Sequence, residues 1–139
     1  MNVNDVKILD LPRCLDPRGN LSFVENSRHI PFDIKRVYWV YDVPGGESRG
    51  AHAHKEFEEF IVAASGSFKV TVDDAKERKT FLLNKPYQGL LVRKGIWRDL
   101  TEFSSGAVCL VMTTDFFTED DYIRDYNDFV NYRKLLAED

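Results

Sequence analysis

Cysteine is scarce in this chain, and the two cysteines present form no motif. Cys14 and Cys109 lie far apart and make no C-x-x-C pair. The N-terminal segment lacks the apolar core of a secretion signal. We therefore expect two reduced thiols and a cytoplasmic location. Cys109 lies in the apolar run AVCLVMTT and is expected to be a small core residue.

Long apolar runs and an excess of basic residues are also missing. No stretch approaches the ~18 apolar residues of a membrane span, so no membrane association is predicted. The 19 Lys and Arg residues are outnumbered by 23 Asp and Glu residues, which gives a net charge of −4. A surface of this sign repels the phosphate backbone. This argues against a general nucleic-acid binder and leaves only a local basic pocket open.

No linker, low-complexity segment or internal repeat divides the 139 residues. The hydrophobic fraction of 43% and the charged fraction of 30% are typical of a globular protein. We expect residues 1–139 to form a single domain, which at this length buries about two-thirds of the surface of the unfolded chain.

Short β-like runs separated by turn residues fill most of the chain. About nine or ten strands are predicted, as in an antiparallel sandwich or barrel. The SGS segment at residues 65–67 is predicted to be a hairpin turn. The expected strands cover residues 5–9, 21–25, 34–43, 58–64, 68–74, 78–84, 89–95, 96–103 and 107–114.

The C-terminal segment has a helical pattern instead. Thr118 followed by Asp121 resembles a capping box. Apolar side chains then recur with helical period at Tyr122, Ile123, Tyr126, Phe129 and Val130. We expect a C-terminal helix that packs this aromatic stripe on the barrel.

Alternation within residues 34–43 separates two faces of one predicted strand. Arg36, Tyr38 and Val40 share one face, and Val37, Trp39 and Tyr41 share the other. The first face therefore carries a cation beside a phenol. Either a solvated pocket or an ordinary edge strand facing water accounts for this pattern.

Two of the three histidines, His52 and His54, lie two residues apart. In a strand, residues i and i+2 project from the same side, so the two rings can converge on one point. With Gly46, Glu59 and Gly66 they form the pattern G-x5-H-x-H-x4-E-x6-G, which resembles the first motif of the cupin superfamily. The resemblance implies an all-β jelly roll (a double-stranded β-helix) with a site in the barrel mouth.

Many cupins bind a divalent metal through these residues and a later histidine in a P-x-G-x2-H motif. Here the corresponding stretch, 93–98, begins with Arg93 and ends with Arg98. Arginine has no lone pair for a metal, and its charge raises the electrostatic cost of a divalent ion. His29 does not fit the missing position. No metal or other cofactor is predicted, although a site of two histidines and Glu59 leaves iron or nickel open.

Without a metal, two neutral imidazoles suit proton transfer, because their ordinary pKa lies near neutral pH. With Tyr38 and Arg49 nearby, the set could remove a proton from a carbon next to a carbonyl and stabilise the resulting enediolate.

A closer resemblance extends over nearly the whole chain. The stretches IPFDIKRVYWVYDV, SRGAHAHK, GLLVRKGIWRDL and DYIRDYNDF are together similar to the sugar 3,4-ketoisomerases that act on dTDP-4-dehydro-6-deoxyglucose, the WxcM-like group. The resemblance implies an isomerase without cofactor that moves the ketone from C4 to C3, in the biosynthesis of amino sugars for surface polysaccharides. It also implies a homodimer with swapped N-terminal strands.

The resemblance assigns roles to individual residues. His52 corresponds to the general base, His54 to its companion that orients or shares the proton, and Tyr38 to a proton donor or relay. Glu59 is a departure, because the family usually has glutamine there. The other candidates for contact with the substrate are Arg36, Arg49, Lys55 and Arg124 for the pyrophosphate, Trp97 as a wall, and Arg98 and Arg18 at positions that vary in the family.

Three other functions stay open. A 3,5-epimerase-like enzyme would also need a base histidine and a tyrosine. A non-catalytic sugar-binding cupin and a metal-dependent dioxygenase-type cupin are the others. The sequence does not say whether a gluco or a galacto product forms.

Overall fold

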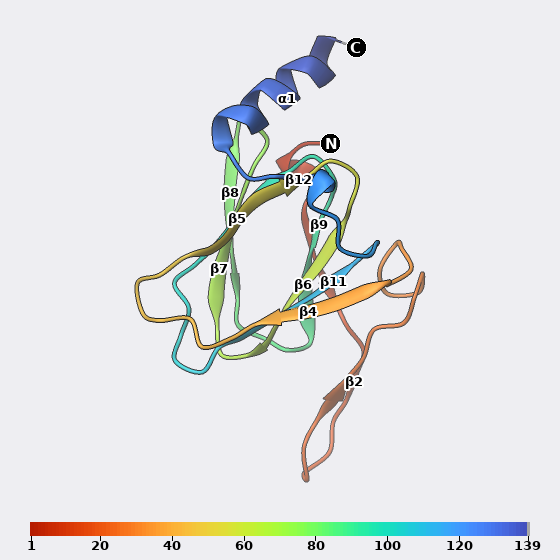
Figure 1. Ribbon diagram of the computed structural model, residues 1–139. Coiled ribbons are helices and arrows are strands. Elements are labelled where there is room, and N and C mark those ends of the chain that lie inside the picture. The colour runs from red at the N-terminus through yellow and green to blue at the C-terminus, as the bar shows by residue number, and fades with distance from the viewer. Residues whose placement is uncertain (139) are drawn as a thin grey trace.

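Two five-stranded antiparallel sheets face each other in the computed structural model, which describes residues 1–138 (Figure 1). The first sheet has the order β1 (Lys7–Asp10), β9 (Gln88–Val92), β6 (Glu59–Ser65), β11 (Val108–Thr113) and β4 (Arg36–Val40). The second has the order β12 (Tyr122–Ile123), β5 (Arg49–His54), β10 (Trp97–Thr101), β7 (Phe68–Asp73) and β8 (Arg78–Leu83).

The remaining elements are short or terminal. The 3-10 helices η1 and η2 span Val3–Asp5 and Glu119–Asp121, and the helix α1 spans Tyr126–Glu138. An extended arm carries the two-stranded sheet of β2 (Arg13–Cys14) and β3 (Leu21–Ser22). This mostly β architecture with one C-terminal helix confirms the predicted fold class. No helix within residues 1–138 is long and apolar enough to cross a membrane.

The nine predicted strands are present, but β2, β5 and β12 were not among the predicted strands, and two other features differ from the prediction. The expected strand at 21–25 is reduced to Leu21–Ser22, because it pairs only with the two residues of β2. The SGS turn is not a hairpin. It joins β6 to β7, but β6 pairs with β9 and β11 whereas β7 pairs with β8 and β10. The chain therefore crosses from one sheet to the other at Gly66, whose φ of +67° favours glycine.

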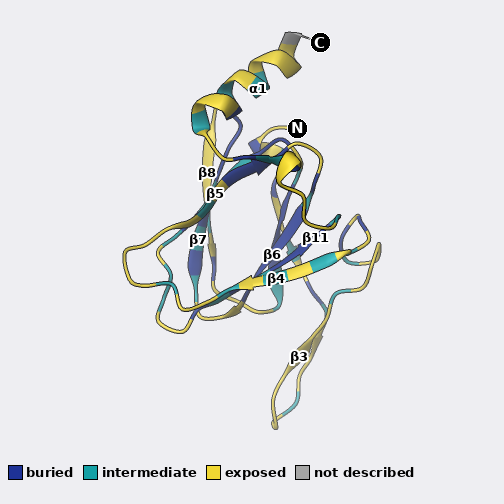
Figure 2. Ribbon diagram, viewed as in Figure 1, coloured by how far each residue is buried: buried dark blue, intermediate teal, exposed yellow. Residues whose placement is uncertain are grey.

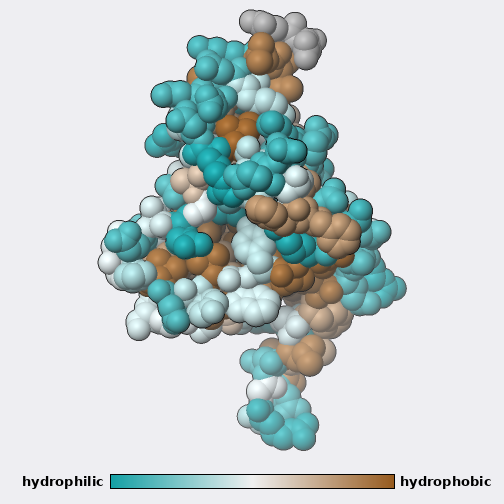
Figure 3. Space-filling view, in the orientation of Figure 1, coloured by the Kyte–Doolittle hydropathy of each residue, from teal (hydrophilic) through white to brown (hydrophobic). Residues whose placement is uncertain are grey.

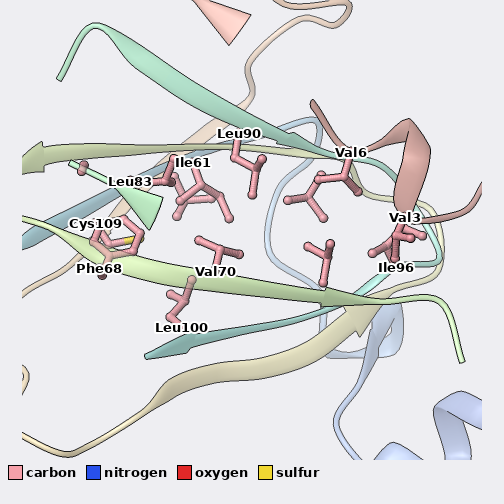
Figure 4. Close-up of a cluster of buried hydrophobic side chains, with 14 residues drawn as sticks. Val3, Val6, Ile61, Phe68, Val70, Leu83, Leu90, Ile96, Leu100 and Cys109 are labelled. Atoms are coloured by element: carbon pink, nitrogen blue, oxygen red, sulfur yellow. The ribbon is translucent and has the colours of Figure 1, made fainter. Parts of the chain in front are cut away.

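The main core lies between the sheets and explains why buried and exposed side chains alternate along the strands. Ile61, Phe68, Val70, Leu90 and Leu100 point into it from both sheets (Figure 4). β6 is apolar on both faces, because the segment before β4 covers its outer side and buries Phe60 and Val62. Figure 2 shows the resulting contrast between the buried β6 and β7 and the exposed arm.

The predicted helix begins later than its pattern indicates. Thr118 makes no side-chain capping hydrogen bond, and Tyr122 and Ile123 form β12, paired with His54 and Ala53 of β5. The helix α1 begins only at Tyr126. The capping-box prediction was wrong because the Asp121 carboxylate accepts hydrogen bonds from the backbone of Glu56 and Phe57 instead.

Candidate active site

A pocket with a volume of about 440 Å³ opens at one end of the barrel, between β4, β5, β10 and β12. This volume falls in the range of small-molecule sites. The polar side chains that line it include Arg36, Tyr38, Arg49, His52, Arg98 and Arg124. The face of β4 predicted to carry a cation and a phenol is therefore a pocket wall. β4 is also an edge strand, whose other face is exposed at Val37 and Trp39, and Tyr41 just beyond its end is exposed as well.

The two histidines of β5 do converge, as the strand period predicts. The Nε2 atoms of His52 and His54 are 3.2 Å apart, and both side chains are buried. His52 lines the pocket, whereas His54 lies behind it. Of the two histidines, His52 is therefore the one that can contact a molecule in the pocket.

Asp121 is a buried partner that the sequence analysis missed. Its Oδ2 lies 3.0 Å from Nδ1 of His54, and its two oxygens also accept hydrogen bonds from the backbone N–H groups of Glu56 and Phe57. The only local signal was a carboxylate in the segment TEDDY, which we interpreted as part of a helix cap. Tyr122, expected to pack under a helix, instead lines the pocket beside Arg36, whose Nη2 donates to the Tyr122 hydroxyl at 3.3 Å.

A second buried network lies beneath the pocket. Arg98 donates to Glu59 through Nε at 2.9 Å and through Nη2 at 3.1 Å. The Tyr38 hydroxyl donates to Oε2 of Glu59 at 2.6 Å and accepts from Nη2 of Arg98 at 2.7 Å. Arg98 also donates to the carbonyl of Gly50 at 2.9 Å. A Cβ at position 50 would overlap this guanidinium, so that only glycine fits there.

These contacts fix the charge states of the network. Burial alone would raise the pKa of Glu59, but Arg98 and His54 outweigh it and hold that pKa well below its ordinary value. Burial alone would lower the pKa of Arg98, but Glu59 and Tyr38 raise it. Glu59 and Arg98 therefore form a true ion pair.

The pKa values of Tyr38 and His52 shift in opposite directions. Burial raises the pKa of Tyr38 well above its ordinary value, although Arg98 acts against this. Burial, followed by the charge of Arg98, lowers the pKa of His52 to about 2. At neutral pH, Tyr38 therefore keeps its proton and His52 is a neutral imidazole. The lowered pKa also makes His52 a weaker base than the near-neutral imidazole that the sequence analysis expected, because burial and Arg98 disfavour its protonated form.

The cupin metal ligands do not fit a divalent ion here. Ligand atoms of His52, His54 and Glu59 lie within 4.8 Å of one another. However, both carboxylate oxygens of Glu59 accept hydrogen bonds from Arg98, and Nε2 of His54 faces His52. A cation at this position would have to displace a buried guanidinium and would be repelled by it.

Four of the predicted contact residues lie elsewhere than expected. Glu59 is only 1% exposed and lies under the pocket rather than in its lining. Trp97 neighbours Arg98 on β10 and so faces the opposite side, where it packs against Tyr126 and Phe129 of α1.

Lys55 and Arg18 also lie outside the pocket lining of this chain. Lys55 follows His54 at the end of β5, where its side chain is exposed. Arg18 lies at the tip of the arm, 2.8 Å from Asp16, with 90% of its side chain exposed. By contrast, Arg36, Arg49 and Arg124 do line the pocket.

Comparison with known proteins agrees with this geometry. A curated relative, the TDP-4-oxo-6-deoxy-alpha-D-glucose-3,4-oxoisomerase of Aneurinibacillus thermoaerophilus, is 40% identical over 126 residues, which cover 91% of each chain. A 3,4-ketoisomerase from Helicobacter canadensis has a crystal structure with a TM-score of 0.91 and 42% identity, covering 94% of this chain and 98% of that one.

Two further solved structures show a strong and a weaker similarity to this chain. A histidine-to-asparagine mutant of the 3,4-ketoisomerase QdtA from Thermoanaerobacterium thermosaccharolyticum, in complex with TDP-4-keto-6-deoxyglucose, has a TM-score of 0.91 and 33% identity, covering 94% of each chain. The dTDP-4-dehydrorhamnose 3,5-epimerase of Bacillus anthracis shares the fold at a TM-score of 0.76, with 17% identity and coverage of 88% and 79%.

The two-sheet jelly roll is the fold of the RmlC-like cupins, and its pocket here presents His52 beside a phenol and guanidinium groups. Residues 4–134 match the family described as FdtA: WxcM-like, C-terminal. The chain belongs to this family of sugar-nucleotide 3,4-ketoisomerases, and it is an isomerase.

Proposed function

We propose that the protein converts TDP-4-keto-6-deoxyglucose into its 3-keto isomer, in a pathway to deoxyamino sugars of surface polysaccharides. The observation that carries this proposal is the neutral His52 imidazole in a pocket that also contains Tyr38 and guanidinium groups. The curated oxoisomerase, 40% identical, and the solved ketoisomerases support the choice of substrate.

The nucleotide part of the substrate is an anion that needs cationic partners. Arg36, Arg49 and Arg124 line the pocket from three separate elements or their ends, so they can surround a pyrophosphate. Guanidinium groups bind phosphate oxygens through paired, charge-assisted hydrogen bonds. This local basic pocket is compatible with the net charge of −4 of the whole chain.

The reaction is a proton transfer between neighbouring carbons. His52 removes the hydrogen of C3, which the C4 carbonyl acidifies, and the electron pair of that bond forms an enediolate. A proton then adds at C4. The C3 hydroxyl loses its proton as C3 becomes the ketone, and O4 gains one, with Tyr38 as donor or relay. Each transfer by a positioned group accelerates the reaction by roughly 10²–10⁴.

Incubation with TDP-4-keto-6-deoxyglucose in deuterated water tests this function. We expect a product with its ketone at C3 and deuterium at C4, observed by NMR. Label at C5 would instead indicate epimerisation, and no exchange would indicate binding alone; either result contradicts the proposal. The rate is expected to survive treatment with a chelator, because Arg98 occupies the carboxylate that a metal would need. If a chelator abolishes activity and iron or nickel restores it, the prediction of metal-independent catalysis is contradicted.

We also propose a homodimer in which the arm packs on a second copy of the chain. Leu15 and Leu21 on the arm are 69% and 57% exposed, and Trp39 on the outer face of β4 and Tyr41 just after it are 57% and 60% exposed. Figure 3 shows the arm extending from the body with a hydrophilic tip and apolar side chains near its base. Isolated apolar segments of this kind are stabilised by burial against a partner. Arg18 lies outside the pocket of its own chain, so its predicted role depends on this exchange.

Light scattering after size-exclusion chromatography tests the dimer. We expect twice the chain mass of 16.1 kDa for the wild type. Trp39→Glu is expected to shift the protein towards monomer, because it places a charge in the proposed apolar interface. Leu135→Glu, at a 62% exposed position on α1, is the matched control and is expected to stay dimeric. A monomeric wild type would contradict the proposal.

The two free cysteines, one exposed and one buried, support a reducing compartment, and we propose a cytoplasmic location on that basis.

A further inference from the structure

A continuous set of contacts leads from the pocket into the protein interior. His52 lies at the pocket, and its Nε2 is 3.2 Å from Nε2 of His54. Nδ1 of His54 is in turn 3.0 Å from Oδ2 of Asp121. The Asp121 side chain is 7% exposed and does not line the pocket, so it has no direct access to a substrate.

The partners of His54 determine which ring nitrogens carry protons. A carboxylate accepts only, so Nδ1 of His54 must donate to Asp121. In a neutral ring, Nε2 of His54 is then an acceptor, and the proton between the two imidazoles belongs to Nε2 of His52. Nδ1 of His52 is left as the nitrogen with a free lone pair, and hence as the basic atom.

The same contacts provide a place for the proton that the base removes. When Nδ1 of His52 takes the C3 proton, its Nε2 can pass a proton to Nε2 of His54. The positive charge then lies on His54, whose two nitrogens face Asp121 at 3.0 Å and Glu59 at 3.5 Å. On His52 itself, burial and the cations Arg98 and Arg124 disfavour a positive charge and outweigh the opposite effect of Glu59 on the pKa of this histidine. The Tyr122 phenol also packs on His54, with the two ring centroids 4.5 Å apart.

We propose that Asp121 is a positioning residue for the proton transfer. It holds His54 in the Nδ1-protonated tautomer, which makes Nδ1 of His52 the base, and with Glu59 it stabilises the proton passed to His54. In this step the C3–H bond breaks and an N–H bond forms at Nδ1 of His52. The Nε2–H bond of His52 breaks as one forms on His54, and the electron pair of the C3–H bond enters the enediolate. The role of Asp121 in the reaction rests on the proposed function, whereas the tautomers of the resting protein do not depend on it.

The resting tautomers are measured directly by ¹⁵N NMR of the folded protein. The chain has three histidines, so its imidazole spectrum is simple, and His52→Asn and His29→Asn assign the signals. We expect His54 protonated at Nδ1 and His52 protonated at Nε2. A wild-type spectrum with His54 protonated at Nε2 only, or with His54 doubly protonated at rest, would overturn the inference.

Asp121→Asn tests the consequence for the reaction. An amide facing Nδ1 of His54 can donate a hydrogen bond, which favours the opposite tautomer and moves the shared proton onto His54. We expect kcat to fall by about 10²–10⁴-fold, the usual contribution of a positioned proton-transfer group. An aspartate-to-asparagine change behind the histidine of a serine protease lies at the upper end, at about 10⁴-fold. The KM for the sugar nucleotide is expected to change little, because Asp121 lies outside the pocket lining.

The matched control is Asp120→Asn on the same 3-10 helix, where the side chain is exposed. It is expected to keep the wild-type kcat. The acidic limb of the kcat profile against pH should move in Asp121→Asn and not in Asp120→Asn, since a merely structural role for Asp121 would leave the limb in place. If Asp121→Asn keeps the wild-type rate and profile, the inference fails. If the wild type itself does not turn over the keto sugar, the proposed function fails while the NMR result still decides the tautomers.

Discussion

His52→Asn is expected to abolish turnover of TDP-4-keto-6-deoxyglucose while leaving TDP binding nearly unchanged. Asparagine is smaller than histidine and has no basic nitrogen, so the C3 proton has no acceptor at the pocket surface. Loss of a positioned general base lowers the rate by roughly 10²–10⁴-fold, and we expect the upper part of that range because His54 lies behind the pocket and cannot replace His52.

Binding should persist because the groups that surround the pyrophosphate are retained. Arg36, Arg49 and Arg124 belong to other parts of the pocket wall. Steady-state kinetics and calorimetric titration with TDP measure the two quantities separately. His29→Asn is the matched control, since His29 contacts Phe23 and the Glu25 backbone, away from the pocket. A His52→Asn enzyme with near wild-type kcat would remove His52 from the role of base.

Arg98→Met is expected to be the most destabilising single change in the site. It removes the partner of a fully buried carboxylate, because Glu59 and Arg98 are 1% and 2% exposed and share two hydrogen bonds. Breaking a buried ion pair from one side costs about 3–5 kcal/mol, which is a large part of the total stability of a domain. Urea denaturation followed by circular dichroism measures this difference in the free energy of unfolding.

Two further variants separate charge burial from loss of packing. The double variant Arg98→Met with Glu59→Leu replaces both charges, and we expect it to be more stable than Arg98→Met alone, because no unpaired charge stays buried. Lys69→Met breaks the exposed ion pair with Glu102, and we expect a cost below about 1 kcal/mol. A double variant less stable than Arg98→Met would show that the network contributes through shape rather than charge.

Local sequence patterns predicted the parts of the site that lie on one strand. The period of two along β5 and β4 assigned His52 and His54 to one face of their strand and Arg36 and Tyr38 to one face of theirs. Both assignments hold in the structure. We did not apply this period to β10 and named both Trp97 and Arg98 as contacts. Adjacent residues of a strand face opposite sides, and the structure turns Arg98 to the pocket and Trp97 to α1.

Contacts between distant segments were not predictable in this way. Asp121 is 67 residues from His54 and Arg98 is 60 residues from Tyr38, and no periodicity connects such positions. The segment around Tyr122 was assigned to a helix because its apolar spacing suits one. The pairing of β12 with β5 prevailed, since it satisfies backbone groups at a sheet edge and brings Asp121 to His54.

By itself the sequence determined the strand faces and the pair of imidazoles, because these follow from the alternation of side chains along a single extended segment. The jelly-roll class came from the resemblance of its histidine motif to that of the cupins. The tertiary structure alone decided which histidine meets the pocket, which carboxylate lies behind it, and that Arg98 is the partner of Glu59. Those features depend on how far-separated strands pack together, and burial then sets the charge that each group carries.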